Sequence, residues 1–249
     1  MISRRLLGVA GLAALGCAAL AWGLDRPQAY GANVDFRVVI GPPPAPGSAA
    51  ATAERAGFAR TIAGIDSPAW QAAKAQVFPS SPEVMQQLGC AIGRAISPVA
   101  TPVTARLLGR VAADVRMPSE AAKAFYKRDR PFVGASDSRT CDPRTLGSIG
   151  GTSGGVLSYS YPSGHAATGA IWARTLADVV PARAATISAW GRALGDNRVT
   201  CRVHWPSDIV AGRQLGDAVY ARLTTLPAFR ADIAAARAEL ARATAATGC

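Results

Sequence analysis

The sequence predicts an all-α protein, and three observations support this fold class. Apolar residues make up 49% of the 249-residue chain and charged residues 17%, a balance typical of a folded domain. Alanine and leucine dominate the periodic stretches, whereas runs of β-branched residues are short. Glycine and proline divide the chain into segments of about three to five helical turns. We therefore expect a single helical domain.

Residues 1–23 are predicted to be a signal peptide, because two arginines precede an apolar run that ends in small residues. A lipid anchor at Cys17 is an alternative, and the export route stays open. No later stretch reaches the roughly 18 apolar residues that a membrane-spanning helix needs. We expect a soluble, exported protein, either periplasmic or secreted from a bacterium.

Removing the signal peptide lowers the formal net charge from +11 to +9. This basic excess raises the local concentration of anions, which fits an anionic substrate, an anionic surface or solubility alone. No run of five basic residues and no helix-turn-helix or zinc spacing is found, so we expect no specific nucleic-acid partner and no metal. Four cysteines remain, and in an exported chain they predict up to two disulfides with three possible pairings. These are Cys90, Cys141, Cys201 and Cys249.

Residues 24–50 are a Pro/Gly-rich segment in which GPPPAPGSAAA cannot hold a helix, and residues 51–249 are expected to form one domain. Helices are predicted at 51–64, 67–77, 82–95, 101–115, 118–129, 164–179, 182–194, 206–224 and 227–245. In the fourth of these, valine and leucine recur every three to four residues and give one apolar face. The connection 132–161 contains GSIGGTSGG, which lacks the Gly-Lys-Ser/Thr ending of a nucleotide-binding loop. We interpret it as a flexible loop.

The first candidate cluster is KAFYKRDRPF. Lys123 and Arg130 are seven residues apart, which is two helical turns and nearly the same face. Pro131 disfavours helical geometry at Arg130, so we expect the helix to end there and the guanidinium to point off its end. A solvated basic face is the alternative interpretation.

The second cluster, SYPSGHAATG, holds one of the two histidines of the chain. Pro162 and Ser163 are expected to start a helix, and the amides of Ser163, Gly164 and His165 then have no partner within it. The positive end of the helix dipole favours an anion there, and Gly164 lets a ligand approach the backbone closely. Alternatively, Ser163 is only a helix cap and His165 a surface residue.

The third cluster, NRVTCRVHWPSDIVAG, holds Arg198, His204 and Asp208. Pro206 at a first helical position places Asp208 in the first turn and His204 just before it, so the carboxylate can reach the imidazole. A His–Asp pair that only fixes a loop is the alternative.

Together, the three clusters hold both histidines and the three candidate cations. A histidine oriented by a carboxylate is a nucleophile, and a second, protonated histidine is a general acid. Arginine and lysine match the oxygens of a phosphoryl group. The combination predicts a phosphoryl-transfer site.

The pattern Lys-x6-Arg-Pro, Pro-Ser-Gly-His and Arg-x5-His-x3-Asp, spread over residues 123–208, resembles the signature of the phosphatidic-acid-phosphatase type 2 superfamily, which also includes vanadium haloperoxidases. Chain length, the export signal and the stretches RPF and HWPSDIVAGR are most similar to the bacterial class A non-specific acid phosphatases. The resemblance covers about residues 51–225. It implies a helical bundle of the acid phosphatase/vanadium-dependent haloperoxidase type, hydrolysis of small phosphate monoesters and no cofactor. Asn197 departs from the signature, which usually has serine there, so we expect this amide to donate to phosphate or to brace a neighbour.

By this resemblance, His204 attacks phosphorus and becomes phosphohistidine, Asp208 orients it, and His165 protonates the leaving alcohol and later activates water. The groups that hold the phosphoryl oxygens would be Lys123, Arg130, Arg198, the Ser163 hydroxyl and the Gly164 amide. Because one histidine must carry a proton while the other is neutral, we predict an acidic pH optimum. A vanadium-dependent haloperoxidase and a non-catalytic module that binds anions or nucleic acid stay as alternatives. Phosphotransferase activity and a homo-oligomer are also compatible with the sequence.

Overall fold

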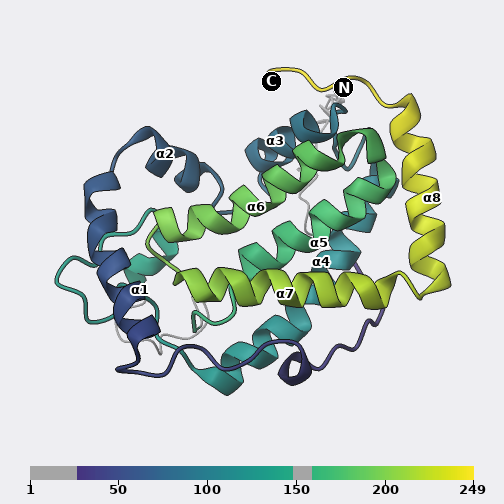
Figure 1. Cartoon of the computed structure of the whole chain (residues 1–249). Coiled ribbons are helices and arrows are strands. Elements are labelled where there is room, and N and C mark those ends of the chain that lie inside the picture. Colours follow the sequence, from purple (N-terminus) through teal and green to yellow (C-terminus); the bar gives the residue numbers. More distant parts are fainter. Residues whose placement is uncertain (1–26, 148–158) are drawn as a thin grey trace, which may run out of the picture.

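The computed structural model describes residues 27–147 and 159–249, which form eight α-helices and four 3₁₀ helices with no β-strand among them (Figure 1). The predicted all-α class is confirmed. The predicted signal peptide (1–23), the alternative anchor at Cys17 and most of the GSIGGTSGG stretch lie outside the described residues. Within the two described ranges, none of the helices combines the length and the apolar character required to cross a membrane.

Helices α2 and α3 start where the sequence supplies a serine cap followed by proline. At α2, the hydroxyl of Ser67 accepts the amide of Trp70 at 3.2 Å, and Pro68 occupies the first helical position. The α-helices are α1 (Ala49–Arg60), α2 (Pro68–Ala75), α3 (Pro82–Ile92), α4 (Pro102–Tyr126), α5 (Gly164–Val179), α6 (Ala184–Thr200), α7 (Pro206–Leu223) and α8 (Pro227–Arg242). The 3₁₀ helices are η1 (Phe36–Val38), η2 (Thr61–Gly64), η3 (Pro143–Gly147) and η4 (Pro181–Arg183).

The predicted break between helices 101–115 and 118–129 is wrong, because α4 continues through Pro118. Val115 before the proline and Ala122 after it are both buried. The hydroxyl of Ser119 donates to the carbonyl of Val115 at 2.7 Å, which supplies a hydrogen bond beside the proline. Burial of one continuous face on both sides therefore outweighs the local cost of proline.

The ends of α4 and α6 also differ from the prediction. α4 ends at Tyr126, because Lys127 adopts a left-handed conformation (φ 48°) and its amide closes on the carbonyl of Lys123. Arg130 therefore lies in the following loop and not on the helix. α6 extends to Thr200, beyond the predicted end at residue 194, so Arg198 lies in its last turn.

α5 is the central helix, flanked by α6 and α7 and packed against α4 (Figure 1). Glycines permit this close approach. A Cβ at Gly191 of α6 would lie 2.5 Å from the carbonyl oxygen of Gly169, and one at Gly216 of α7 would lie 2.6 Å from that of Ala167. The first turn of α7 also meets the start of α5, where the amide of Ser163 donates to the carbonyl of Asp208 at 2.9 Å.

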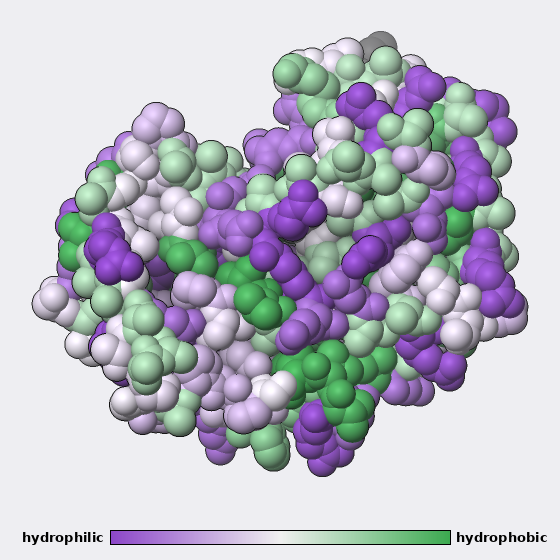
Figure 2. All heavy atoms as spheres, in the orientation of Figure 1, coloured by the Kyte–Doolittle hydropathy of each residue, from purple (hydrophilic) through white to green (hydrophobic). Residues whose placement is uncertain are grey.

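The segment before α1 lies against α4. The amides of residues 30–32 donate to the carboxylate of Asp114 at 2.7–2.8 Å. Next to them, the rings of Phe36 and Phe125 are 5.6 Å apart between centroids. Figure 2 shows apolar side chains gathered where η1 meets the end of α4, and Val38 and Phe125 are exposed there.

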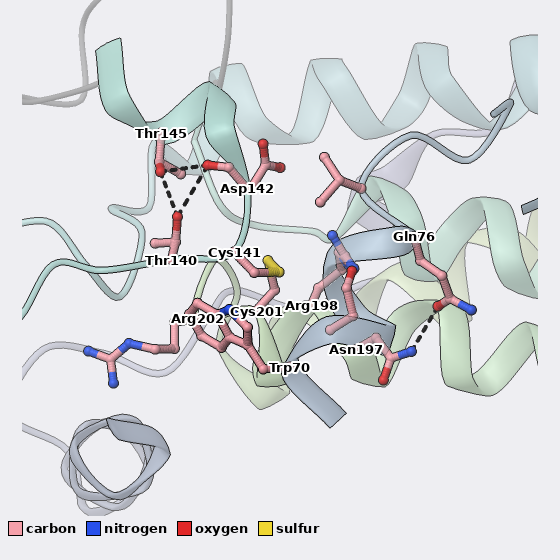
Figure 3. Close-up of a disulfide and its surroundings, with 12 residues drawn as sticks. Trp70, Gln76, Thr140, Cys141, Asp142, Thr145, Asn197, Arg198, Cys201 and Arg202 are labelled. Atoms are coloured by element: carbon pink, nitrogen blue, oxygen red, sulfur yellow. Dashed lines mark hydrogen bonds between the residues drawn. A yellow bond between two sulfur atoms is a disulfide. The ribbon is translucent and has the colours of Figure 1, made fainter. Parts of the chain in front are cut away.

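Two disulfides form, Cys90–Cys249 and Cys141–Cys201, which is one of the three pairings left open by the sequence. The first ties the C-terminal segment to α3. The second ties the loop after α4 to the residue that follows α6 (Figure 3).

Candidate active site

The three cations predicted to bind phosphate reach one place from different segments. Lys123 lies in the last turn of α4, Arg130 in the loop after it, and Arg198 in the last turn of α6. Their exposed fractions are 7%, 6% and 0%, respectively. Burial lowers the pKa of each side chain, to about 10 for Arg130 and for Arg198. Both arginines therefore stay charged at neutral pH, with little water to solvate them.

Arg198 carries buried donors that have no partner in the described part of the chain. Its Nη2 donates to the carbonyl of Ala73, whereas Nε and Nη1 are buried and have no hydrogen-bond partner among the described residues. Figure 3 shows Arg202 extending away from both Arg198 and Asp142. Buried donors rarely stay unpaired in folded proteins, so this space suits an anion.

Ser163 and Gly164 form the N-terminal mouth of α5. The buried hydroxyl of Ser163 accepts the amide of Ala166 at 3.3 Å, as a helix cap. The amide of Ser163 donates to the carbonyl of Asp208 at 2.9 Å, so this amide is not available to a ligand as predicted. A Cβ on Gly164 would lie 3.7 Å from Nζ of Lys123, which places the ammonium at the helix mouth.

His204 lies between a carboxylate and an arginine. Its Nδ1 is 3.2 Å from Oδ2 of Asp208, and its Nε2 is 3.3 Å from Nη1 of Arg130. Because a carboxylate accepts hydrogen bonds, we assign the hydrogen to Nδ1, and the lone pair of Nε2 then faces the cations. Burial lowers the pKa of His204 well below its ordinary value, and the three cations lower it further. The ring is therefore neutral, with an oriented lone pair.

Asp208 is fully buried in the first turn of α7. Its Oδ2 also accepts the amide of Trp205 at 2.8 Å, and its Oδ1 accepts Nη1 of Arg128 at 2.5 Å. Burial raises the pKa of Asp208 to about 6, and Arg128 is the strongest of the groups that oppose this rise. The carboxylate is consequently ionised at neutral pH and fixes the orientation of His204.

His165 follows Gly164 in α5, and its Nε2 lies 3.0 Å from the carbonyl oxygen of Val77. A carbonyl oxygen only accepts hydrogen bonds, so we assign the hydrogen to Nε2. Nδ1 is then the nitrogen that gains or loses a proton. Burial lowers the pKa of His165 well below its ordinary value, the charge of Arg198 lowers it further, and so would a proton on His204. The two imidazoles therefore lie within electrostatic reach of each other.

Several charged residues around the site escaped prediction. Arg128 belongs to the basic stretch KAFYKRDRPF, and nothing else in the sequence indicates its role. Glu54 of α1 contacts Arg128 at 2.6 Å, and nothing in the alanine-rich sequence of α1 indicates this role. Arg144 pairs with Asp142 at 2.5 Å. Its Nη2 lies 3.4 Å from the carbonyl oxygen of Val77, which His165 also contacts.

Asn197 does not extend the set of phosphate ligands. Its Nδ2 donates to Oε1 of Gln76 at 2.8 Å and braces α6 against the segment that follows α2 (Figure 3). In residues 27–147 and 159–249, no three His, Cys, Asp or Glu side chains cluster in a way that could hold a metal ion.

Comparison with known proteins places the chain in a family. Residues 104–231 match the PAP2 superfamily. Over 211 residues the chain is 33% identical to a non-specific acid phosphatase of Salmonella typhimurium, which covers 84% of this chain and 81% of that protein. Over 214 residues it is 30% identical to an acid phosphatase of Zymomonas mobilis, which covers 86% of this chain and 78% of that protein.

The chain belongs to the PAP2 superfamily. It is a phosphoric monoester hydrolase of the acid phosphatase kind, as the motifs implied.

Proposed function

We propose that this enzyme hydrolyses small phosphate monoesters through a phosphohistidine at Nε2 of His204. The observation that supports the mechanism best is the environment of that nitrogen. Asp208 lies 3.2 Å from Nδ1, Arg130 lies 3.3 Å from Nε2, and the charges of Lys123 and Arg198 also act on the ring. A neutral imidazole oriented in this way is a nucleophile, and the cations attract the phosphoryl group to it.

In the first step, Nε2 of His204 attacks phosphorus, and the bond from phosphorus to the leaving oxygen breaks. His165 gives a proton to that oxygen, so the alcohol leaves neutral. Asp208 stabilises the positive charge that develops on the phosphorylated ring. In the second step, His165 takes a proton from water, the water oxygen attacks phosphorus, and the bond from Nε2 to phosphorus breaks to release inorganic phosphate.

The phosphoryl oxygens are held by charge and by the helix mouth. Lys123, Arg130 and Arg198 neutralise the charge that spreads over these oxygens in the transition state. The hydroxyl of Ser163 and the amide of Gly164 donate from the positive end of α5. The Nε and Nη1 donors of Arg198 have no partner in the described part of the chain, so both can donate to phosphoryl oxygens.

The pH dependence follows from His165. In the protein without substrate, its pKa lies well below the ordinary value, so the proton needed for the first step is present only in acid. A phosphoryl dianion bound beside it raises that pKa again. Activity therefore falls as the pH rises, and the optimum is acidic.

We also propose that the enzyme works outside the cytoplasm, in the periplasm or after secretion, following removal of residues 1–23. Two disulfides favour an oxidising compartment. The same phosphohistidine would pass its phosphoryl group to an alcohol in place of water, which gives phosphotransferase activity.

The test is to trap acid-labile phosphate on the protein after brief mixing with labelled p-nitrophenyl phosphate. Wild type should retain label, and His204→Ala should retain none and lose hydrolysis. A His204→Ala variant that keeps both label and turnover would refute the mechanism. Oxidation of a halide with vanadate and peroxide, without phosphate release, would instead identify a haloperoxidase.

A further inference from the structure

A buried ion pair lies behind Asp208. Arg128, in the loop after α4, donates through Nη1 to Oδ1 of Asp208 at 2.5 Å and to the hydroxyl of Ser207 at 2.7 Å. Its Nη2 donates to Oε2 of Glu54 at 2.6 Å, and Oε1 of Glu54 accepts the amide of Ser207 at 2.8 Å. The side chains of Arg128 and Glu54 are only 12% and 10% exposed. These contacts link α1, the loop and the first turn of α7.

The surroundings fix Arg128 in this place. Its guanidinium carbon lies 5.3 Å from the centroid of the Trp205 ring. The indole Nε1 of Trp205 donates to the carbonyl of Asp129 at 2.9 Å, and the amide of Ser160 donates to the carbonyl of Arg128 at 2.8 Å. Both terminal nitrogens of Arg128 are already bound by protein groups. We therefore expect Arg128 to affect the reaction through Asp208 and the first turn of α7.

The charge of Arg128 matters because Asp208 is fully buried. The charged or titratable groups that act on or contact this carboxyl are Arg128, Arg130, His204 and the phenol of Tyr161. Burial raises the pKa of Asp208, and Arg128 is the largest opposing influence. Loss of Arg128 would favour the neutral acid, which cannot stabilise an imidazolium.

We propose that Arg128 and Glu54 are positioning residues of the phosphohydrolase reaction. Arg128 keeps Asp208 ionised and directs its second oxygen toward His204. Glu54 holds Arg128 in place and accepts an amide of the first turn of α7, which would otherwise lack a partner. This inference rests on the proposed nucleophilic role of His204.

The experiment measures the pH profile of kcat and kcat/KM with p-nitrophenyl phosphate. In Arg128→Gln, the acidic limb of kcat/KM should move up by about one pH unit or more. We expect kcat to fall about 10–100-fold, the usual range for loss of a supporting contact, and KM to change less than about threefold, because Arg128 contacts no phosphoryl oxygen.

Two further variants separate charge from geometry. Arg128→Lys should restore the acidic limb but only part of kcat, because one ammonium cannot reproduce a planar fork with several partners. Glu54→Gln keeps an acceptor for the Ser207 amide but removes the ionic contact that holds Arg128, so kcat should fall by a smaller factor with little change in KM.

Arg110→Gln is the matched control. Arg110 also forms a partly buried ion pair, with Asp232 at 2.9 Å, and lies over an aromatic ring, that of Tyr30 at 3.6 Å. The control should lower the melting temperature and leave the pH profile unchanged.

An unmoved acidic limb and a wild-type kcat in folded Arg128→Gln would overturn the proposal. If that variant does not fold, wild-type profiles in both Arg128→Lys and Glu54→Gln would overturn it. A failure of the proposed function looks different, because then the wild-type enzyme forms no phosphohistidine or His204→Ala stays active.

Discussion

Replacing Arg198 by methionine tests whether the buried cations serve an anion. Arg198 is fully buried, two of its nitrogens lack a partner among the described residues, and burial lowers its pKa from 12.5 to about 10. Below pH 10 the side chain is charged in both the folded and the unfolded protein, so the depressed pKa measures a cost to folding. At about 1.4 kcal/mol per pKa unit, this cost is about 3 kcal/mol.

Arg198→Met should therefore stabilise the protein while it damages the enzyme. Loss of the hydrogen bond to Ala73 offsets about 1 kcal/mol, and the remaining 2 kcal/mol or so corresponds to a rise in melting temperature of about 4–8 °C. Two charge-assisted hydrogen bonds to the phosphoryl group, each about 1.5–3 kcal/mol, are lost as well. We expect kcat/KM to fall by about 10²–10⁴. Calorimetry in phosphate-free buffer and steady-state kinetics measure the two effects.

Arg202→Met is the matched comparison. Arg202 is equally buried, but it donates to the carbonyls of Arg139 at 2.8 Å and Asp137 at 2.6 Å and to the hydroxyl of Thr61 at 2.9 Å. Its removal leaves these acceptors unpaired, so the melting temperature should fall. If Arg198→Met lowers the melting temperature as much as Arg202→Met does, or leaves kcat/KM intact, the reasoning about Arg198 is refuted.

Three further predictions concern packing, covalent structure and pH. Gly191→Ala should lower the free energy of unfolding by about 1–3 kcal/mol, because its Cβ would meet a backbone oxygen of α5. Gly57→Ala on α1 has room for the added methyl group and should not lower it. Urea unfolding curves of the two variants measure the difference. Serine at both Cys141 and Cys201 removes a 60-residue cross-link and should cost about 4 kcal/mol of unfolding free energy, also read from urea curves. The low pKa of His165 predicts that kcat/KM is maximal below about pH 6.5, and a maximum near pH 8 in a pH–rate profile would contradict its role as acid.

The local parts of the site could be predicted from the sequence because each depends on a short-range rule. A proline at the first position of α7 puts Asp208 in the first turn, where its carboxylate accepts the amide of Trp205 and reaches His204. The Pro-Ser-Gly sequence likewise marks the start of α5. These rules involve residues only a few positions apart, and tertiary contacts did not override them.

Tertiary contacts decided the rest. Pro118 predicts a helix end, yet α4 continues because both sides of the proline bury the same face. α4 ends before the proline that follows Arg130, because Lys127 takes a left-handed conformation that lysine rarely adopts. Glu54 lies 74 residues from Arg128 and gives no sequence signal, since a lone glutamate on an alanine-rich helix is usually solvated.

The convergence of the clusters depends on the glycines of α6 and α7. A Cβ at Gly212 would collide with the carbonyl oxygen of Ser163, the residue whose amide binds the carbonyl of Asp208 at 2.9 Å. Separating α5 from α7 by the thickness of one methyl group would break that hydrogen bond. The mouth of α5 would then move away from His204, although no catalytic residue had changed. The glycines between the motifs are therefore as necessary to the site as the charged residues within the motifs. A search for the motifs alone does not detect them.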